Sequence, residues 1–393
     1  MNMKFPQNFL WGSALSAYQA EGNNVNSDWW EWEKRIGKEN SGMASRHYEM
    51  YEEDFDLAKK LNHNTHRFSI EWSRIEPEEG KFCEKELEHY VKVILSLKAR
   101  NIEPMVTLHH FTNPIWFSKL GGWQKKASID YFLRYCDFVV RHLAKYVHFW
   151  ITINEPTIFI SHAYLFGAWP PQAKSYLKSK IVENNLFQAH LLTYRLIHNI
   201  YKKLNLTKPS VSIAQYTQNY VPCGNNLKNR FIAYFMDKRL NFWFLDKMMQ
   251  HKAIDFVGLN YYTRQKIGKN DPHPVKKNSL GWDIYPEGLY ELLLKVGQYH
   301  LPVIITENGI CTADDNLRWE YIKSHLNSVY RATKKGVNVI GYLYWSLIDN
   351  FEWDKGFFPR FGLIDINYKT YKRTIKESAV KFGRVCKTGQ LDE

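Results

Sequence analysis

Hydrophobic residues recur along the chain in eight short runs that are rich in β-branched and aromatic side chains. The runs cover residues 9–17, 65–70, 104–109, 148–154, 210–215, 255–261, 302–307 and 337–345. Runs of this length and composition, bounded by polar and turn-forming residues, are typical of β-strands. The pattern therefore predicts eight strands distributed over the whole chain.

Amphipathic stretches with helical spacing of their apolar residues lie between these runs. They cover residues 47–61, 84–100, 129–146, 184–203, 286–299 and 318–335. Alternating strands and helices, with eight strands in all, are typical of a (β/α)8 barrel. No Ser-, Gly- or Pro-rich linker interrupts the pattern, so we expect an α/β fold with a single TIM-barrel domain over residues 1–393. Residues 387–393 are expected to form a frayed polar tail.

Polar or aromatic side chains lie at or just past the C-terminal ends of seven of the eight predicted strands. They are Gln19, Arg67, His109, His110, Asn154, Glu155, Asn260, Tyr261, Tyr262, Glu307, Asn308 and Trp345. In α/β barrels these strand ends surround one mouth, where the active site is found. We therefore expect these side chains to converge on a single pocket.

Two of these residues are glutamates that end strand-like runs and are followed by turn-forming residues. Glu155 closes Ile151-Thr-Ile-Asn-Glu-Pro156, and Glu307 closes Val303-Ile-Ile-Thr-Glu-Asn-Gly309. A single glutamate at a strand end often forms a salt bridge or caps a helix. Two carboxylates able to meet at one barrel mouth indicate cleavage of a glycosidic bond.

The composition is that of an ordinary globular protein, with 45% hydrophobic and 24% charged residues. Aromatic residues reach 16%, which most simply reflects a large core and is a mild hint of sugar stacking. The net charge is +13. The lysines are scattered and form no basic block or nucleic-acid motif, so we expect no nucleic-acid partner and interpret the charge as a solubility feature.

Features of targeting and redox state favour a cytoplasmic protein. The N-terminal residues lack the apolar segment of a signal peptide, and no apolar run reaches transmembrane length. We therefore expect no membrane partner. The five cysteines are widely spaced without a Cys-x-x-Cys pair, which favours free thiols in a reducing compartment.

Seven motifs in the same order make the chain resemble glycoside hydrolase family 1, the β-glucosidase/β-galactosidase family. The motifs are Phe9-Leu-Trp-Gly-Ser-Ala14, Ser16-Ala-Tyr-Gln-Ala-Glu-Gly22, Arg67-Phe-Ser69, Thr152-Ile-Asn-Glu-Pro156, Asn260-Tyr-Tyr262, Thr306-Glu-Asn-Gly309 and Trp345-Ser-Leu-Ile-Asp-Asn-Phe-Glu-Trp353. The resemblance extends from about Phe5 to Phe382, nearly the whole chain.

The resemblance implies a retaining exo-β-glycosidase that acts on short β-linked glucosides, galactosides or fucosides without a cofactor. Glu155 would be the acid/base and Glu307 the nucleophile that forms a covalent glycosyl-enzyme, with the carboxyl groups about 5–5.5 Å apart. Glu155 must then be protonated near neutral pH while Glu307 stays ionised. Hydrolysis and transglycosylation share this intermediate, and the resemblance leaves both open.

The resemblance also assigns supporting roles. Arg67 would lie beside the nucleophile, and Tyr262 would hydrogen-bond and position it. Asn154 would bind the sugar 2-OH, and Asn260 would support the site from behind. The non-reducing sugar would be bound by Gln19, His110, Glu352 and Trp353, with Trp345 as a stacking floor.

The adjacent residues His109 and His110 raise the alternative of a metal site. Neighbouring residues of a strand point to opposite faces, and no other ligand spacing supports a metal site. We therefore expect no metal, with His110 facing the pocket.

Two other functions within the same family remain open. A 6-phospho-β-glycosidase would have to bind a dianion, which a carboxylate at Glu352 would repel, although the net charge of +13 favours anions. A non-catalytic sugar-binding relative would generally lack one of the two catalytic carboxylates, and this chain has both.

The chain departs from the family pattern at three places. The segment 243–256 is abbreviated before the sixth strand of the barrel. Phe111 stands where a Trp is usual, and Thr157 stands where many members have an aromatic residue. Trp116 could fill part of this space or could belong to the core.

Overall fold

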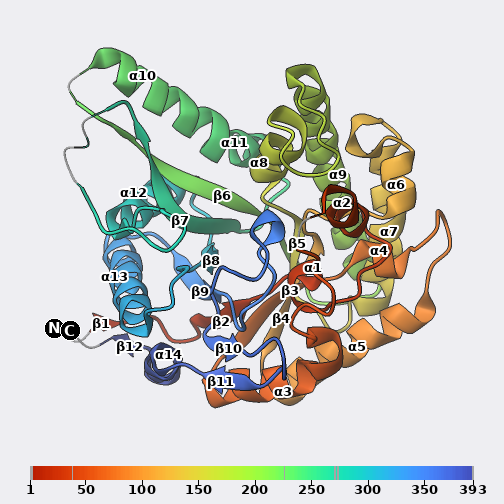
Figure 1. Ribbon diagram of the computed structural model, residues 1–393, viewed down its shortest axis with the longest axis horizontal. Helices are drawn as coiled ribbons and strands as arrows, with labels where there is room; N and C mark the ends of the chain where they lie inside the picture. The colour runs from red at the N-terminus through yellow and green to blue at the C-terminus, as the bar shows by residue number, and fades with distance from the viewer. Residues whose placement is uncertain (1–2, 38, 225, 270, 272–273, 392–393) are drawn as a thin grey trace.

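Eight parallel strands close into a barrel in the computed structural model, which describes residues 3–37, 39–224, 226–269, 271 and 274–391. The barrel strands are β2 (Leu10–Ala14), β3 (Thr65–Ser69), β4 (Glu103–His109), β5 (Phe149–Asn154), β6 (Ser210–Pro222), β7 (Val257–Ile267), β8 (Val303–Asn308) and β9 (Val339–Trp345). Each strand pairs with its neighbours in chain order, and β9 pairs with β2 to close the ring. The predicted (β/α)8 barrel is confirmed (Figure 1).

Helices surround the barrel on its outside (Figure 1). Those that the amphipathic pattern predicted are α3 (His47–Lys60), α5 (Glu84–Ala99), α7 (Ser128–Leu143), α9 (Tyr176–Lys203), α12 (Pro286–Val296) and α13 (Asp315–Lys334). The other α-helices are α1 (Ala17–Ala20), α2 (Asp28–Ile36), α4 (Trp72–Ile75), α6 (Ile115–Lys119), α8 (Pro156–Phe159), α10 (Leu227–Met236), α11 (Trp243–Gln250) and α14 (Glu377–Thr388). Short 3-10 segments are η1 (Gly122–Gln124), η4 (Gly297–Tyr299) and η5 (Trp353–Lys355), and π-helical segments are η2 (Ile160–Leu165) and η3 (Asp237–Phe242). No helix among these described segments is both long enough and apolar enough to span a bilayer.

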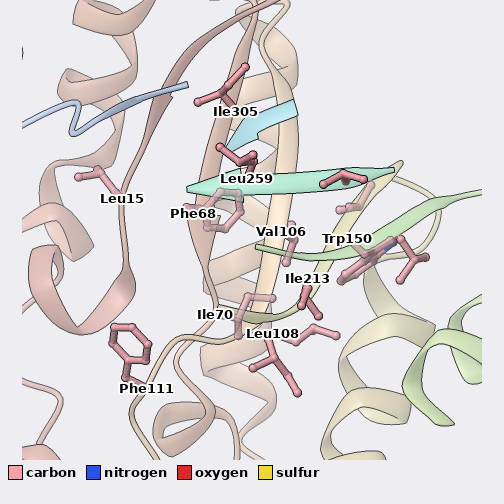
Figure 2. Packing of buried hydrophobic residues seen from close by; sticks show 14 of the residues in the cluster. Leu15, Phe68, Ile70, Val106, Leu108, Phe111, Trp150, Ile213, Leu259 and Ile305 are labelled. Atoms are coloured by element: carbon pink, nitrogen blue, oxygen red, sulfur yellow. The ribbon is translucent and has the colours of Figure 1, made fainter. Parts of the chain in front are cut away.

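The apolar core has two layers, one inside the barrel and one between the barrel and the helices. Inside the barrel lie Met105, Ile151, Ala214, Phe256, Ile304 and Leu343. The outer layer includes Phe68, Val106, Trp150, Ile213, Leu259 and Ile305 (Figure 2). On β8, Ile304 therefore faces inward, while its neighbour Ile305 faces the helices. Both faces of the strands are covered, as in other parallel sheets.

Strands β6 and β7 are longer than the sequence predicted and leave the barrel together. Their pairing continues from Asn219 with Arg264 to Pro222 with Ile267. Helix α10 lies against the outer end of this two-stranded extension (Figure 1). The extension follows the C-terminal ends of the strands and so adds a wall on the side of the barrel where the predicted site lies.

The C-terminal tail differs from expectation. Residues 387–391, expected to fray, complete α14 and form strand β12 (Gln390–Leu391), which pairs antiparallel with β1 (Met3–Lys4). Leu391 is 1% exposed, so apolar burial as well as backbone hydrogen bonds fixes this segment. Residues 392 and 393 lie outside the described residues. A second small hairpin joins β10 (Ile364–Ile366) to β11 (Arg373–Ile375).

Gly309 offers a test of the packing between the ends of β8 and β9. A Cβ atom on this residue would overlap the carbonyl oxygen of Trp345, a backbone atom that cannot move alone. We expect Gly309→Ala to lower the free energy of unfolding by about 1–3 kcal/mol, measured by denaturant unfolding, because overpacking forces the backbone to shift.

The matched control is Gly297→Ala. Its Cβ would first meet a methyl group of Val337 at 3.0 Å, which is a side-chain atom that can adjust. The control should change stability by less than about 1 kcal/mol. Equal losses in the two variants would contradict the close approach of Gly309 to Trp345.

Candidate active site

A cavity of about 1060 Å³ opens at the C-terminal ends of the barrel strands. Nine of the eleven predicted site residues line it. They are Gln19, His110, Asn154, Glu155, Tyr262, Glu307, Trp345, Glu352 and Trp353. The other two, Arg67 and Asn260, are 1% and 0% exposed, and each hydrogen-bonds one of the two glutamates. The strand ends thus bring together residues that are more than 300 positions apart.

Glu307 is held by two donors. Arg67 Nη1 lies 2.5 Å from Glu307 Oε1, and the Tyr262 hydroxyl donates to Oε2 at 2.6 Å. Burial raises the pKa of Glu307 above its usual range, and the Arg67 charge and the Tyr262 hydrogen bond oppose part of that rise. Both donors favour the ionised carboxylate, which is the form required of a nucleophile.

The alternation of side chains along β8 does not by itself aim Glu307 into the cavity. Since Ile304 faces the barrel interior, a strict period of two would turn Glu307 outward. The pairing between β7 and β8 passes from Leu259–Ile305 to Asn260–Glu307, so β8 contains one extra residue at this point. Such an irregularity re-aims a side chain, and here it puts Glu307 in the cavity wall.

Glu155 lies in an environment that favours its protonated form. Burial raises the pKa of Glu155 well above its usual range, and the negative charge of Glu307 raises it further. Asn260 Nδ2 donates to Glu155 Oε1 at 2.7 Å and opposes this shift only in part. Both carboxyl groups have a raised pKa, but the rise is greater for Glu155, so Glu155 is the one that more readily keeps a proton.

The backbone of Glu155 is unusual. Its backbone angles are φ 41° and ψ 58°, in the left-handed region that residues other than Gly rarely adopt. The residue follows the last residue of β5 and precedes Pro156, the first residue of α8, while its N–H donates to Ala214 O at 2.8 Å. Backbone strain of this kind is typical of functional positions, where the surrounding structure enforces it.

Asn154 and His110 are two further polar residues of the cavity wall, and hydrogen bonds orient both side chains. Arg67 Nη2 donates to Asn154 Oδ1 at 2.6 Å, and Asn154 Nδ2 lies 3.1 Å from His110 Nε2. Burial and the Arg67 charge lower the pKa of His110, so its neutral ring accepts this hydrogen bond at Nε2. The proton is then on His110 Nδ1, a buried atom with no partner among the described residues. It is available to a sugar hydroxyl.

Gln19 and Glu352 face each other beside the aromatic rings. Ser16 Oγ donates to Gln19 Oε1 at 2.7 Å, and Gln19 Nε2 donates to Glu352 Oε2 at 3.1 Å. Burial and the Glu307 charge raise the pKa of Glu352 to about 8. The indoles of Trp345 and Trp353 stack near the His110 ring, at 6.0 and 6.1 Å between centroids. Polar groups and flat rings together match the hydroxyl groups and C–H faces of a sugar.

The two adjacent histidines diverge, as predicted. His110 lines the cavity, whereas His109 Nε2 lies 3.0 Å from Asn113 Oδ1 and its ring packs on Trp123. Over the ranges that the structure describes, no three His, Cys, Asp or Glu side chains form a cluster able to hold a metal ion.

The departures from the family pattern take different places. Phe111 and Thr157 both line the cavity, and Phe111 lies 5.1 Å from the Trp353 ring. Trp116 does not line it, because its indole donates to Glu76 O and its ring packs on Trp72. The suggestion that Trp116 fills the space is therefore wrong, and its core alternative is correct.

Several lining residues were not found from the sequence. They are Trp169, Tyr216, Gln218, Trp282 and Phe361. Tyr216 stacks on Tyr262 at 6.4 Å between ring centroids. Trp282 and Phe361 pack edge-on against the ring of Tyr262. The apolar and β-branched residues that continue beyond position 215 could have indicated Tyr216 and Gln218 as part of a longer strand. Trp282 lies outside any predicted strand, so the pattern held no signal for it.

Comparisons with known proteins agree with this geometry. A family model described as glycosyl hydrolase family 1 matches residues 1–252 and 240–390. Beta-glucosidase A of Thermotoga maritima is 31% identical over 446 residues, covering 100% of both chains. A beta-glycosidase structure from Pyrococcus horikoshii is 38% identical with a TM-score of 0.93, covering 100% of this chain and 97% of the other. A 6-phospho-beta-galactosidase of Clostridium acetobutylicum is 29% identical over 462 residues, covering 97% and 96% of the chains.

The barrel, the paired glutamates in its mouth and the matches over nearly the full length lead to one conclusion: this chain belongs to glycosyl hydrolase family 1 and is a glycoside hydrolase.

Proposed function

We propose that the protein is a retaining exo-β-glycosidase acting on short β-linked glucosides, galactosides or fucosides. The observation that carries the proposal is the unequal treatment of the two glutamates. Glu307 receives two donors that favour its anion, whereas burial and a neighbouring anion keep the proton on Glu155. The names of its relatives, beta-glucosidase A among them, support a β-glycoside as substrate.

In the first step, Glu307 attacks the anomeric carbon while the glycosidic bond breaks. The Glu155 carboxylic acid gives its proton to the departing oxygen, so the aglycone leaves as a neutral alcohol. Arg67 and Tyr262 hold the Glu307 oxygens in place. A covalent glycosyl-enzyme and an ionised Glu155 result.

In the second step, Glu155 accepts a proton from water, which attacks the anomeric carbon and releases Glu307. When the glycosyl ester at Glu307 has been cleaved, Glu155 is protonated and Glu307 is ionised, as at the start. Two inversions give net retention. The carboxyl groups and water supply every proton and bond in this scheme, which therefore requires no cofactor.

The residues that line the cavity would recognise one terminal sugar. Gln19, His110 and Glu352 would bind the sugar hydroxyls, Asn154 the 2-OH, and Trp345 and Trp353 its flat faces. A substrate lacking one of these hydroxyls would leave a buried polar group unpaired, which costs far more than losing an apolar contact. All of these side chains except the half-buried Glu352 are buried, and this enclosure supports an exo mode of action.

Stereochemistry and two substitutions test the mechanism. We expect p-nitrophenyl β-D-glucoside or galactoside to release the β-anomer first, measured by proton NMR during early turnover.

Glu307→Gln should reduce kcat to the background rate. Glu155→Gln should reduce it by about 10²–10⁴-fold with substrates that need protonation of the leaving group. Initial release of the α-anomer, or full activity of Glu307→Gln, would reject the proposal.

The role of Tyr262 is tested by the pH profile of kcat/KM. The hydroxyl of Tyr262 lowers the pKa of Glu307, so Tyr262→Phe should raise that pKa. Because activity needs ionised Glu307, the acidic limb should move to higher pH. Tyr216→Phe is the matched control, since its hydroxyl accepts from Gln218 Nε2 and is not bonded to Glu307. An unmoved acidic limb in Tyr262→Phe, or the same shift in both variants, would contradict this role.

A 6-phospho-β-glycosidase is the second candidate, and one observation strengthens it. With a pKa of about 8, Glu352 is largely neutral at pH 7 in the free site and repels a phosphate less than the sequence suggested. A 6-phospho-β-galactosidase is also among the relatives. We still favour plain sugars, because Gln19 Nε2 donates to Glu352 and this pair would bind neutral hydroxyls.

Direct competition separates the two candidates. We expect kcat/KM for p-nitrophenyl β-D-glucoside or galactoside to exceed that for the 6-phosphorylated form by about tenfold or more, the equivalent of one lost hydrogen bond to a charged group. A preference for the phosphorylated substrate would replace the first candidate by the second. A non-catalytic sugar-binding role would be indicated if neither substrate turned over.

A further inference from the structure

Helix α10 carries a stripe of large apolar side chains that face solvent. Leu227, Phe231, Tyr234 and Phe235 are 78%, 69%, 63% and 58% exposed. Their spacing of four, three and one residues places them on one side of the helix. We call these four residues the α10 stripe. Single exposed apolar residues are common, but four neighbours on one helix face mark an interaction surface.

The opposite side of α10 is fixed to the protein. Ala233 is buried there, and Asn229 Nδ2 donates to Cys223 O at 2.8 Å, which ties the helix to the end of β6. Helix α10 lies at the periphery, over the extension of β6 and β7 (Figure 1). The α10 stripe therefore faces solvent on a helix whose other side is attached to the protein.

The charges around the stripe are positive. Lys228, Arg230 and Lys238 are exposed next to it. Asp237, the acidic residue within the sequence segment 226–242, is paired with Lys295 at 2.7 Å, so it does not neutralise them. The outward surface therefore combines apolar area with a local excess of cations, on a chain whose net charge is +13.

The positive charge around the α10 stripe distinguishes two possible partners, a second copy of the chain and an anionic membrane. A symmetric dimer would place the surface against its own copy and bring like charges together. Aromatic and Leu side chains flanked by Lys and Arg are the signature of helices that lie in the interface of an anionic membrane. We propose that α10 docks the protein onto an anionic lipid surface, with the stripe inserted among the headgroups.

This proposal revises the expectation of no membrane partner. That expectation rested on the absence of an apolar run of spanning length, and interfacial docking needs no such run. Docking would also bring the bilayer close to the cavity. Met236 ends α10 and Leu240 follows in η3, and both line the mouth. Glycosides carried by lipids would then lie within reach of the site.

Vesicle co-sedimentation tests the docking. We expect the full-length protein to bind phosphatidylcholine vesicles containing phosphatidylglycerol, and to bind pure phosphatidylcholine much less. Phe231→Ser/Phe235→Ser should lower the partition coefficient by about tenfold or more, because two aromatic anchors are lost. Lys228→Glu/Arg230→Glu/Lys238→Glu should lower it as well, and added salt should weaken binding of the unaltered protein.

The control variant is Lys92→Glu/Leu95→Ser on α5, across the barrel from α10 (Figure 1). Both residues are exposed, and this variant should bind vesicles like the unaltered protein. None of the substituted residues lines the cavity, so hydrolysis of a soluble aryl glycoside reports folding separately from docking.

Three outcomes would overturn the proposal. The first is no binding to anionic vesicles by the unaltered protein. The second is equal binding by Phe231→Ser/Phe235→Ser. The third is a dimer, seen by light scattering without lipid, that the same double substitution dissolves, since the stripe would then be an interface between copies. Each outcome leaves the proposed glycosidase activity unaffected.

Discussion

The guanidinium of Arg67 is the group on which the geometry of the candidate active site depends. It lies on β3 and contacts three other strands: Glu307 on β8, Asn154 on β5 and Thr107 on β4. A fixed fork of donors can satisfy all three at once, which a lysine could not do. Through Asn154 the same contact orients His110. One buried cation thereby fixes Glu307, the proposed nucleophile, and part of the wall that we propose binds the sugar.

The same cation explains how three carboxyl groups share one cavity. Glu155 and Glu307 are buried and Glu352 is half-buried. The Glu307 charge raises the pKa of both other groups, and Glu352 also raises the pKa of Glu155. Of these three carboxyl groups, Arg67 forms an ion pair only with Glu307, which favours the negative charge there and the proton on the other two groups. The division of roles that we propose for Glu307 and Glu155 thus depends on the position of one side chain. It also changes the expected repulsion of a phosphate by Glu352, which is weaker than that of a full carboxylate.

Much of the architecture could be read from the sequence because strands and helices have short, local periods. The eight strands and the six amphipathic helices appear at their predicted positions, and the seven motifs identified the site. The extension of β6 and β7 was missed because its residues are partly exposed and belong to no closed barrel. Likewise, the terminal residues looked polar, yet Leu391 is buried and β12 pairs with β1.

By itself the sequence determined the order of the strands and the residue types at their ends, including Glu155 and Glu307. Only the tertiary structure decided which way Glu307 points, because one extra residue in β8 breaks the alternation that sequence periodicity assumes. It also decided which glutamate holds the proton. Protonation depends on burial and on neighbours such as Arg67, which is 240 positions from Glu307 and meets it only when the barrel closes.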